Sequence, residues 1–240
     1  MQSIYQHILK AKIENRKLLA ILLDPDKLEV DTIKSLISNI HLSPATHIFI
    51  GGSIVADGQT EIIVSEVKKH SSLPVVLFPG DTNQVTNSAD GILFLSLLSG
   101  RNPEFLIEQH IKAAPFLQQS NLEIIPTGYI LIDGGATTAV QQVSKTAPIQ
   151  QDKITLATHT ALAGQYSGKQ LIYLEAGSGA KFAVNTHLIS NVSKAISIPL
   201  IVGGGIRTNE QLQNAYNAGA DLVVIGTAFE KNNDFLKNIH

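Results

Sequence analysis

Short apolar runs, separated by longer stretches of mixed polarity, extend along almost the whole chain. The runs are rich in Ile, Val and Leu and do not alternate between apolar and polar positions, as is typical of parallel strands covered on both faces. Eight such runs are present: Leu18–Leu23, His47–Ile50, Pro74–Phe78, Gly91–Leu98, Glu123–Ile125, Leu171–Leu174, Pro199–Val202 and Leu222–Ile225. We therefore expect eight buried parallel strands.

Stretches with helical periodicity follow most of these runs. They are Asp31–Ile40, Ile62–His70, Pro103–Phe116, Thr155–Tyr166, Thr186–Ile196 and Asn209–Ala218. This alternation predicts βαβ units with right-handed crossovers. Eight units fit an α/β fold of the (β/α)₈, or TIM, barrel type, which typically has about 250 residues, better than the competing doubly wound open sheet. No linker or shift in composition divides the chain, so we expect one barrel domain over residues 1–240.

The connection between the third and fourth runs is unusually short. Only residues 79–90, which are mostly polar and turn-prone, join Phe78 to Gly91. A covering helix needs about ten to fourteen residues besides its loops, so we predict that the third helix of the barrel is reduced or replaced. Either the barrel is simply trimmed there, or the gap exposes an apolar groove in which a long hydrocarbon can lie.

Composition narrows the classes of function. With 18 basic and 20 acidic residues, the net charge of −2 argues against nucleic-acid binding, as does the absence of Trp. The absence of Cys excludes disulfides and thiolate sites. The first sixteen residues lack the continuous apolar core of a signal peptide, and no run approaches the roughly 18 apolar residues of a membrane span. We expect a globular, cytoplasmic protein.

Glycine-rich loops follow the last two runs, which is where TIM barrels usually bind phosphate. Gly203, Gly204 and Gly205 follow the seventh run, and Gly226 and Thr227 follow the eighth. Glycine lets backbone N–H groups approach an anion closely, and the start of a helix adds its dipole. The alternative is that these glycines only form tight turns.

The sixth strand ends in Tyr173-Leu174-Glu175 and is followed by a third glycine loop. The two-residue period of a strand puts Tyr173 and Glu175 on one face and Leu174 on the other. If that face is the mouth of the barrel, a phenol and a carboxylate point at the ligand. Alternatively, Glu175 is a structural carboxylate paired inside the barrel, because an unpaired charge there is costly.

Acidic and hydroxyl side chains follow the first two strands. Asp24, at the tip of the first strand, suits Mg²⁺, which usually binds one or two carboxylates together with substrate phosphates. Ser53 brings a hydroxyl after the second strand. Asp26 has the spacing to Glu29 of a capping box, so we expect it to be mainly structural. The residues alone leave the metal open.

The run YLEAGSGA at Tyr173–Ala180 resembles the geranylgeranylglyceryl phosphate synthase family, which includes heptaprenylglyceryl phosphate synthases. The motifs LDPDK, FIGGS, VGGGIR and IGTAF accompany it in the family's order, so the resemblance spans Leu22 to Phe229. YLEAGSG is quite specific, whereas glycine loops occur in many phosphate-binding barrels. One departure is Leu22, where some members carry Lys. It groups the chain with archaeal and Bacteroidetes-type enzymes and leaves Lys27 and Arg101 as candidates for an additional cation.

This resemblance implies a modified TIM barrel whose third helix is replaced. It implies an enzyme of ether phospholipid synthesis that joins sn-glycerol 1-phosphate, through its C3 hydroxyl, to a long-chain prenyl diphosphate and releases pyrophosphate. Mg²⁺ maps to Asp24 and Ser53. The substrate maps to Tyr173, Leu174, Glu175, Ala176, Gly177, Ser178, Gly179, Gly204, Gly205, Gly226 and Thr227. A homo-oligomer, dimer or hexamer, and transient contact with a membrane surface for product release are also implied. Independently of the resemblance, Arg101 follows the fourth strand, where it is either a phosphate clamp or a solvated arginine at the start of a helix.

Chemistry assigns roles that agree with this resemblance. Glu175 is the best-placed base for the glycerol hydroxyl, and an aromatic ring such as that of Tyr173 can stabilise allylic positive charge. Two other functions compete. A sugar-phosphate isomerase or lyase would pair Asp24 with a second carboxylate such as Asp133. A non-catalytic phosphate-binding barrel would leave Asp24 and Glu175 without a role.

Overall fold

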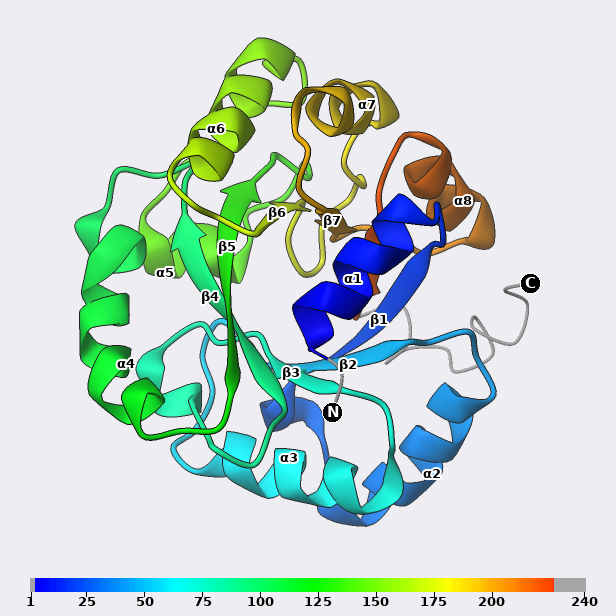
Figure 1. Ribbon diagram of the computed structural model, residues 1–240, viewed down its shortest axis with the longest axis vertical. Helices are drawn as coiled ribbons and strands as arrows, with labels where there is room; N and C mark the ends of the chain where they lie inside the picture. Colours follow the sequence, from blue (N-terminus) through cyan, green and yellow to red (C-terminus); the bar gives the residue numbers. More distant parts are fainter. Residues whose placement is uncertain (1–2, 227–240) are drawn as a thin grey trace.

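Eight parallel strands close into a barrel in the computed structural model, which describes residues 3–226 (Figure 1). The strands are β1 (Leu18–Leu23), β2 (His47–Ile50), β3 (Val75–Leu77), β4 (Gly91–Leu97), β5 (Glu123–Leu131), β6 (Leu171–Glu175), β7 (Leu200–Gly203) and β8 (Leu222–Ile225). Each strand pairs with its neighbour in sequence, and β8 pairs with β1. The predicted barrel is therefore confirmed, and the open sheet is excluded.

Helices surround this barrel (Figure 1). They are α2 (Val30–His41), α3 (Gln59–His70), the π-helical turn η3 (Glu104–Glu108) with α4 (Gln109–Gln118), α5 (Ala139–Ser144), α6 (Ile154–Tyr166), α7 (Thr186–Ala195) and α8 (Asn209–Asn217), besides the 3₁₀ turns η1 (Pro25–Lys27) and η2 (Thr82–Gln84). All six predicted helices are present, whereas α5 was not expected. No helix among residues 3–226 is long and apolar enough to cross a membrane.

The helix α1 (Ile4–Ile13), also not expected, lies across the end of the barrel where the strands begin (Figure 1). Its buried residues Ile4, Ile8 and Ala11 form one stripe that packs against the side chains inside the barrel. The remaining positions of the helix are mostly polar, so the stripe is too narrow to stand out in the sequence. The helix closes one end of the barrel and leaves the other end for a ligand.

The strand β5 is longer than the predicted run, which ends at Ile125. Pro126 lies inside this strand, although proline cannot donate a ladder hydrogen bond. The carbonyl of Pro126 faces the β6 side, where it accepts a hydrogen bond from Gln170, and β6 pairs with β5 only from Thr127 onward. The missing N–H therefore costs no ladder hydrogen bond, and the strand continues to Leu131.

The segment between β3 and β4 contains only the turn η2, which confirms the predicted loss of the third helix. The buried side chain of Gln84 secures this segment. Its amide donates to the carbonyl of Gly52 at 2.7 Å and accepts from the N–H of Gly52 at 3.1 Å. A side chain from the shortened segment thus fixes the loop that follows β2.

Loss of the helix is accompanied by a gap in the barrel wall. The strand β3 pairs with β4 only at Val76↔Gly91 and Leu77↔Ile92, whereas β4 pairs with β5 along its whole length. The carbonyl of Leu95, beyond the end of this pairing, lies 2.6 Å from Nε2 of His110 on α4. A helix side chain therefore replaces the missing strand neighbour at this position.

Candidate active site

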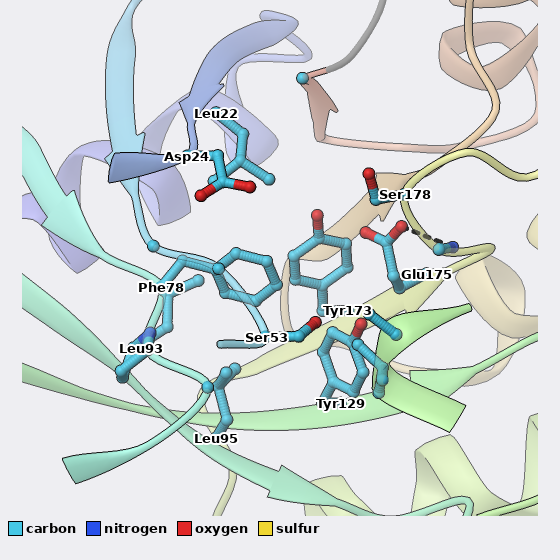
Figure 2. Close-up of a pocket in the computed structure, with 18 of the residues that line it drawn as sticks. Leu22, Asp24, Ser53, Phe78, Leu93, Leu95, Tyr129, Tyr173, Glu175 and Ser178 are labelled. Atoms are coloured by element: carbon cyan, nitrogen blue, oxygen red, sulfur yellow. Dashed lines mark hydrogen bonds between the residues drawn. The ribbon is translucent and has the colours of Figure 1, made fainter. Parts of the chain in front are cut away.

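A cavity of about 430 Å³ begins at the carboxyl ends of the strands (Figure 2). The predicted site residues that line it are Asp24, Ser53, Tyr173, Glu175, Gly177, Ser178, Gly179, Gly204, Gly205 and Gly226. Most of the predicted site is therefore brought together around one space. Thr227 lies outside the described residues.

Three other predicted residues do not line this cavity. Leu174 and Ala176 face the layer between the barrel and its helices, as expected for Leu174 from the two-residue period. The guanidinium of Arg101 donates to the carbonyls of Leu98 and Gly100, at 3.2 and 2.6 Å. As placed here, the side chains of Leu174, Ala176 and Arg101 do not reach a ligand in the cavity.

The carboxylate of Glu175 is buried at the end of β6 and faces the cavity (Figure 2). It accepts one hydrogen bond, from the N–H of Gly177 at 2.7 Å, and forms no ion pair with any residue in the range 3–226. Burial raises the pKa of Glu175 above its ordinary value, while the nearby Tyr173 hydroxyl and the Gly177 N–H oppose this shift. Glu175 is therefore not a structural carboxylate held in a salt bridge. Its raised pKa makes it a stronger base than an exposed Glu.

Tyr173 presents a buried hydroxyl to the same space (Figure 2). This hydroxyl lies beside the Glu175 carboxylate, near Gly203, but has no hydrogen-bond partner among the described residues. Burial and the charge of Glu175 raise the pKa of Tyr173 well above its ordinary value, so the phenol stays protonated at neutral pH. A buried hydroxyl without a partner is uncommon and can donate to a bound ligand.

Two further aromatic rings, which we did not identify from the sequence, adjoin Tyr173 (Figure 2). Phe78 stacks on the Tyr173 ring at 5.3 Å between centroids, and Tyr129 meets it edge-on at 5.4 Å. The pairing Tyr129↔Tyr173 between β5 and β6 explains the second contact. Because the predicted strand ends at Ile125, the sequence does not place Tyr129 on a strand or at the barrel mouth. Three rings around one space can stabilise a cationic carbon.

The glycine loops serve both packing and binding. Gly177, Gly204 and Gly205 have φ values of 96°, 79° and 73°, which L side chains rarely adopt. A Cβ at Gly204 would also collide with Glu175 and with the backbone N of Gly177. Within residues 3–226, the N–H groups of Gly204 and Gly205 make no hydrogen bond, so they remain available to an anion. These glycines can therefore both form tight turns and bind an anion.

Asp24 lies across the cavity from Glu175 (Figure 2). Its Oδ1 accepts from the N–H of Asp26 at 3.3 Å, and its Oδ2 lies 2.9 Å from Nζ of Lys27. The capping-box prediction for Asp26 was wrong, because Asp24 caps the turn η1 and Glu29 precedes α2 without a capping side-chain hydrogen bond. The Asp26 carboxylate is nevertheless structural, since it accepts from the N–H of Ala56 at 3.1 Å.

The oxygen ligands near Asp24 fit a metal site in which the protein supplies few of the ligands. Within residues 3–226, no three His, Cys, Asp or Glu side chains are placed to hold a metal ion among themselves. Asp24 and Ser53 both line the cavity, and a Cβ at Gly52 would come within 3.0 Å of Asp24 Oδ1, so the Ser53 loop approaches the carboxylate. One carboxylate and one hydroxyl suit Mg²⁺, which completes its octahedron with water and phosphate oxygens. Of the two candidate cations, Lys27 lines the cavity and Arg101 does not.

The far side of the cavity is apolar and passes through the gap in the barrel wall. Leu93 and Leu95 line it from the inner face of β4, and Ile92 and Phe94 from the outer face. The cavity continues along Phe105, His110 and Ala113, from η3 and α4. Of the two readings of the short β3–β4 connection, this geometry favours an open apolar groove over a simply trimmed barrel.

Comparison with known proteins gives consistent results over nearly the whole chain. The sequence matches the PcrB family over residues 11–240. The geranylgeranylglyceryl phosphate synthase of Zunongwangia profunda is 57% identical over 230 residues, covering 96% of this chain and 98% of the relative. That of Flavobacterium johnsoniae is 55% identical over 235 residues, covering 98% and 97%. The crystal structure of (S)-3-O-geranylgeranylglyceryl phosphate synthase from Thermoplasma acidophilum, in complex with its substrate sn-glycerol-1-phosphate, has a TM-score of 0.94 and 32% identity, covering 100% and 97%.

Proposed function

We propose that this chain, which belongs to the PcrB family, transfers a geranylgeranyl or similar polyprenyl group to the C3 hydroxyl of sn-glycerol 1-phosphate. The observation that carries the proposal is one continuous cavity with three chemically different parts. Glycine loops with available N–H groups lie at one end, an apolar groove at the other, and Glu175 with the aromatic rings between them. This arrangement accommodates a phosphate, a hydrocarbon and a reacting hydroxyl at the same time.

The competing isomerase or lyase is less well supported. Asp133, the proposed partner of Asp24, does not line the cavity, and its carboxylate accepts from the N–H of Gly135 at 2.9 Å. A sugar phosphate also has no use for an apolar groove. The names of the relatives agree with prenyl transfer and not with this alternative.

In the proposed reaction, the chain binds glycerol phosphate through the glycine loops. Gly204 and Gly205 offer N–H groups to the phosphate, which fixes the glycerol so that the reaction becomes effectively intramolecular. The C3 oxygen attacks C1 of the prenyl group, and the electron pair of the broken C1–O bond leaves with pyrophosphate. Glu175 accepts the hydroxyl proton, and Tyr173 donates a hydrogen bond within the site.

Positive charge develops on the allylic carbon as the C1–O bond stretches. The rings of Phe78, Tyr129 and Tyr173 lie within 6 Å of one another by centroid and present π surface to this charge. The anionic Glu175 lies beside them and adds electrostatic stabilisation. Tyr129 and Tyr173 belong to the core inside the barrel, and the partly buried Phe78 packs against it.

Asp24 and Ser53 are the residues that would hold Mg²⁺ in this scheme. The ion supplies charge neutralisation for the departing diphosphate as a Lewis acid. Lys27, paired with Asp24, is placed to add positive charge at the same end of the diphosphate. The prenyl tail then lies in the groove along β4 and α4, where each buried CH₂ contributes about 0.8 kcal/mol.

The direct test is an assay with purified protein, Mg²⁺, sn-glycerol 1-phosphate and labelled prenyl diphosphates from C10 to C35. We expect an ether product and pyrophosphate only when both substrates are present, and apparent affinity that rises with length until the groove ends. The enantiomeric sn-glycerol 3-phosphate serves as the matched control and should react more slowly. Absence of product at every length would overturn the proposal.

The metal is tested separately. EDTA should abolish turnover and added Mg²⁺ should restore it, while Asp24→Asn should raise the Mg²⁺ concentration needed for half-maximal rate. Turnover that persists in EDTA would remove Mg²⁺ from the scheme without affecting the transfer reaction itself.

The state of the protein in the cell also belongs to this proposal. We place it in the cytoplasm as a homo-oligomer, with transient contact to a membrane surface when the lipid product leaves. Exposed apolar side chains support such contacts: Ile107 and Ile111 lie one helical turn apart, and Ile54 lies at the cavity. Analytical ultracentrifugation tests the oligomer, and co-sedimentation with vesicles tests the membrane contact.

A further inference from the structure

Two of the glycine loops that line the cavity lie directly against each other. One of them, the β6 loop (residues 176–185), joins β6 to α7. A Cβ at Gly204 would lie 2.5 Å from the backbone N of Gly177, and a Cβ at Gly205 would lie 2.7 Å from the carbonyl oxygen of Phe182. The loop that follows β7 therefore approaches the β6 loop so closely, at two places, that only glycine fits between the two backbones.

The side chain of Arg207 links the same two loops between these places. Arg207 belongs to the β7 loop (residues 204–208), and its guanidinium donates to the carbonyl of Ala180 and, at 3.3 Å, to that of Lys181. Its backbone N–H donates to Oε1 of Gln211, in the first turn of α8, at 2.7 Å. Arg207 therefore connects the middle of the β6 loop to the start of α8.

The peptide group between Ala180 and Lys181 is held from both sides. Its carbonyl oxygen accepts from Arg207, and its N–H donates to the carbonyl of Gly134, in the loop after β5, at 2.8 Å. The preceding residue, Gly179, has a φ of 78°, and its N–H makes no hydrogen bond within residues 3–226. Because glycine has more backbone freedom than any other residue, the direction of this N–H depends on the anchored peptide beside it.

We infer that Arg207 is a positioning residue for the phosphate of the substrate. By linking the β6 loop to the β7 loop, it directs the N–H of Gly179 toward the same anion as the N–H groups of Gly204 and Gly205. The inference rests on the proposed binding of sn-glycerol 1-phosphate by the glycine loops, and adds the side chain that makes two loops act as one site. A loop that is already ordered costs the ligand less free energy to bind.

Arg207 lines the cavity, so its charge could attract a phosphate without any effect on the loop. The geometry of the guanidinium distinguishes the two roles. Two different nitrogens, Nη1 and Nη2, reach two successive carbonyls of the β6 loop. Lysine carries the same charge on a single nitrogen and lacks this planar fork. Arg207→Lys therefore separates the charge from the link between the loops.

Calorimetric titration with sn-glycerol 1-phosphate tests this role without turnover. Arg207→Ala should weaken binding about tenfold or more, because it removes two hydrogen bonds from a charged donor. Arg207→Lys should still bind at least about threefold more weakly than the wild type. Lys181→Ala is the matched control, since it removes one positive charge from the β6 loop and leaves the carbonyl that accepts from Arg207. It should bind within about twofold of the wild type.

Hydrogen exchange measures the loop itself. Without ligand, the amides of residues 177–182 in Arg207→Ala should exchange at least about threefold faster than in the wild type, while the amides of the barrel strands stay unchanged. Saturating sn-glycerol 1-phosphate should reduce this difference. Unchanged exchange in this segment, or faster exchange throughout the barrel, would overturn the inference.

The transfer assay adds a kinetic readout. Arg207→Ala should raise KM for sn-glycerol 1-phosphate with little change in kcat or in KM for the prenyl diphosphate. Wild-type affinity in Arg207→Lys would overturn the inference, because the charge alone would then be sufficient, and so would an equal loss of affinity in Lys181→Ala. Failure of the proposed function looks different, because the wild type itself would then form no ether with any diphosphate.

Discussion

The carboxylates at the two ends of the barrel differ in how far the protein completes their hydrogen bonds. At the end closed by α1, Glu123 accepts hydrogen bonds from Ser3 Oγ and from the N–H groups of Ile4 and Tyr5, at 2.5, 2.5 and 2.8 Å. Asp221 likewise pairs with Lys12 and accepts from the N–H of Leu200. At the open end, Glu175 accepts one hydrogen bond and the Tyr173 hydroxyl takes part in none among the described residues.

This difference separates structural from chemical use of a buried polar group. Carboxylates whose hydrogen bonds are completed by the protein stabilise the fold, and little capacity remains for anything else. A buried carboxylate or hydroxyl with unused hydrogen-bonding capacity lowers the stability of the fold until a ligand supplies the missing hydrogen bonds. Each of the following substitutions should therefore affect either turnover or stability, according to the end of the barrel that it changes.

Glu175→Gln should give the largest effect. Loss of the base should cut turnover by about 10²–10⁴-fold, while the free energy of unfolding stays constant or rises, because the variant buries no charge. Rate assays and denaturant melts on the same preparation measure the two quantities. Turnover within a factor of three of wild type would take Glu175 out of the mechanism.

The pH profile sharpens this assignment. Because burial raises the pKa of Glu175, the base takes up a proton at a higher pH than an exposed Glu. On acidification, activity should therefore begin to fall at a pH above the ordinary Glu pKa of 4.5. The residual activity of Glu175→Gln should not show this fall.

Substitution in the glycine loops should come next. Gly226→Val should weaken the affinity for glycerol phosphate about 100-fold, or about 2.7 kcal/mol, by filling the space where the anion meets the loop. The three nearest atoms to a Cβ at Gly226 all belong to Leu22, at 3.5 Å or more, which is ordinary van der Waals contact, so the fold should tolerate it. Gly204→Val should weaken the same affinity but also lower stability, because its Cβ collides with Glu175 and Gly177. Unchanged affinity in both variants would move the phosphate to another place.

Glu123→Gln should give the reverse pattern to Glu175→Gln. The amide keeps the size of the side chain but replaces charge-assisted hydrogen bonds at the start of α1, so the free energy of unfolding should fall by about 1–3 kcal/mol. Turnover at a temperature well below the melting midpoint should stay within twofold of wild type. A large loss of turnover without a loss of stability would contradict the division between the two ends.

The smallest effect is a pH dependence at the closed end. His47 is buried beside His7, and burial together with the charge of His7 lowers the pKa of His47 to about 3. Below the unfolded pKa of about 6.5, the unfolded chain binds a proton that the folded chain does not, so stability falls with falling pH by up to about 1.4 kcal/mol per unit. Between pH 7 and 5 the loss should be about 2 kcal/mol, and His47→Phe should abolish this part of it. An identical slope in the variant would refute the assignment.

Much of this molecule could be predicted from its sequence, for identifiable reasons. Parallel strands buried on both faces stand out as apolar runs, and the missing helix follows from the number of residues between Phe78 and Gly91 alone. The parts that were missed depend on spatial partners. The extension of β5 past Pro126 depends on where β6 begins, and the side-chain clamp of Gln84 on Gly52 depends on a loop thirty residues earlier.

The candidate site divides in the same way. Tyr173, Glu175 and the glycines lie at strand ends, and chain topology gathers strand ends at one edge. Arg101 follows a strand too, but its guanidinium turns back to the carbonyls of its own loop, which no spacing rule predicts. Phe78 looks in the sequence like any core aromatic residue, and only its stacking on Tyr173 distinguishes it.

The gap between β3 and β4 lets the cavity extend in two directions, toward the mouth of the barrel and through its side wall to α4. Glycerol phosphate and the prenyl chain can then enter the cavity from different directions, so that neither blocks the entry of the other. In the proposed reaction, pyrophosphate would leave through the mouth of the barrel and the lipid product through the side wall. We therefore expect random-order binding, in which the two substrates saturate the enzyme independently of the order in which they are supplied.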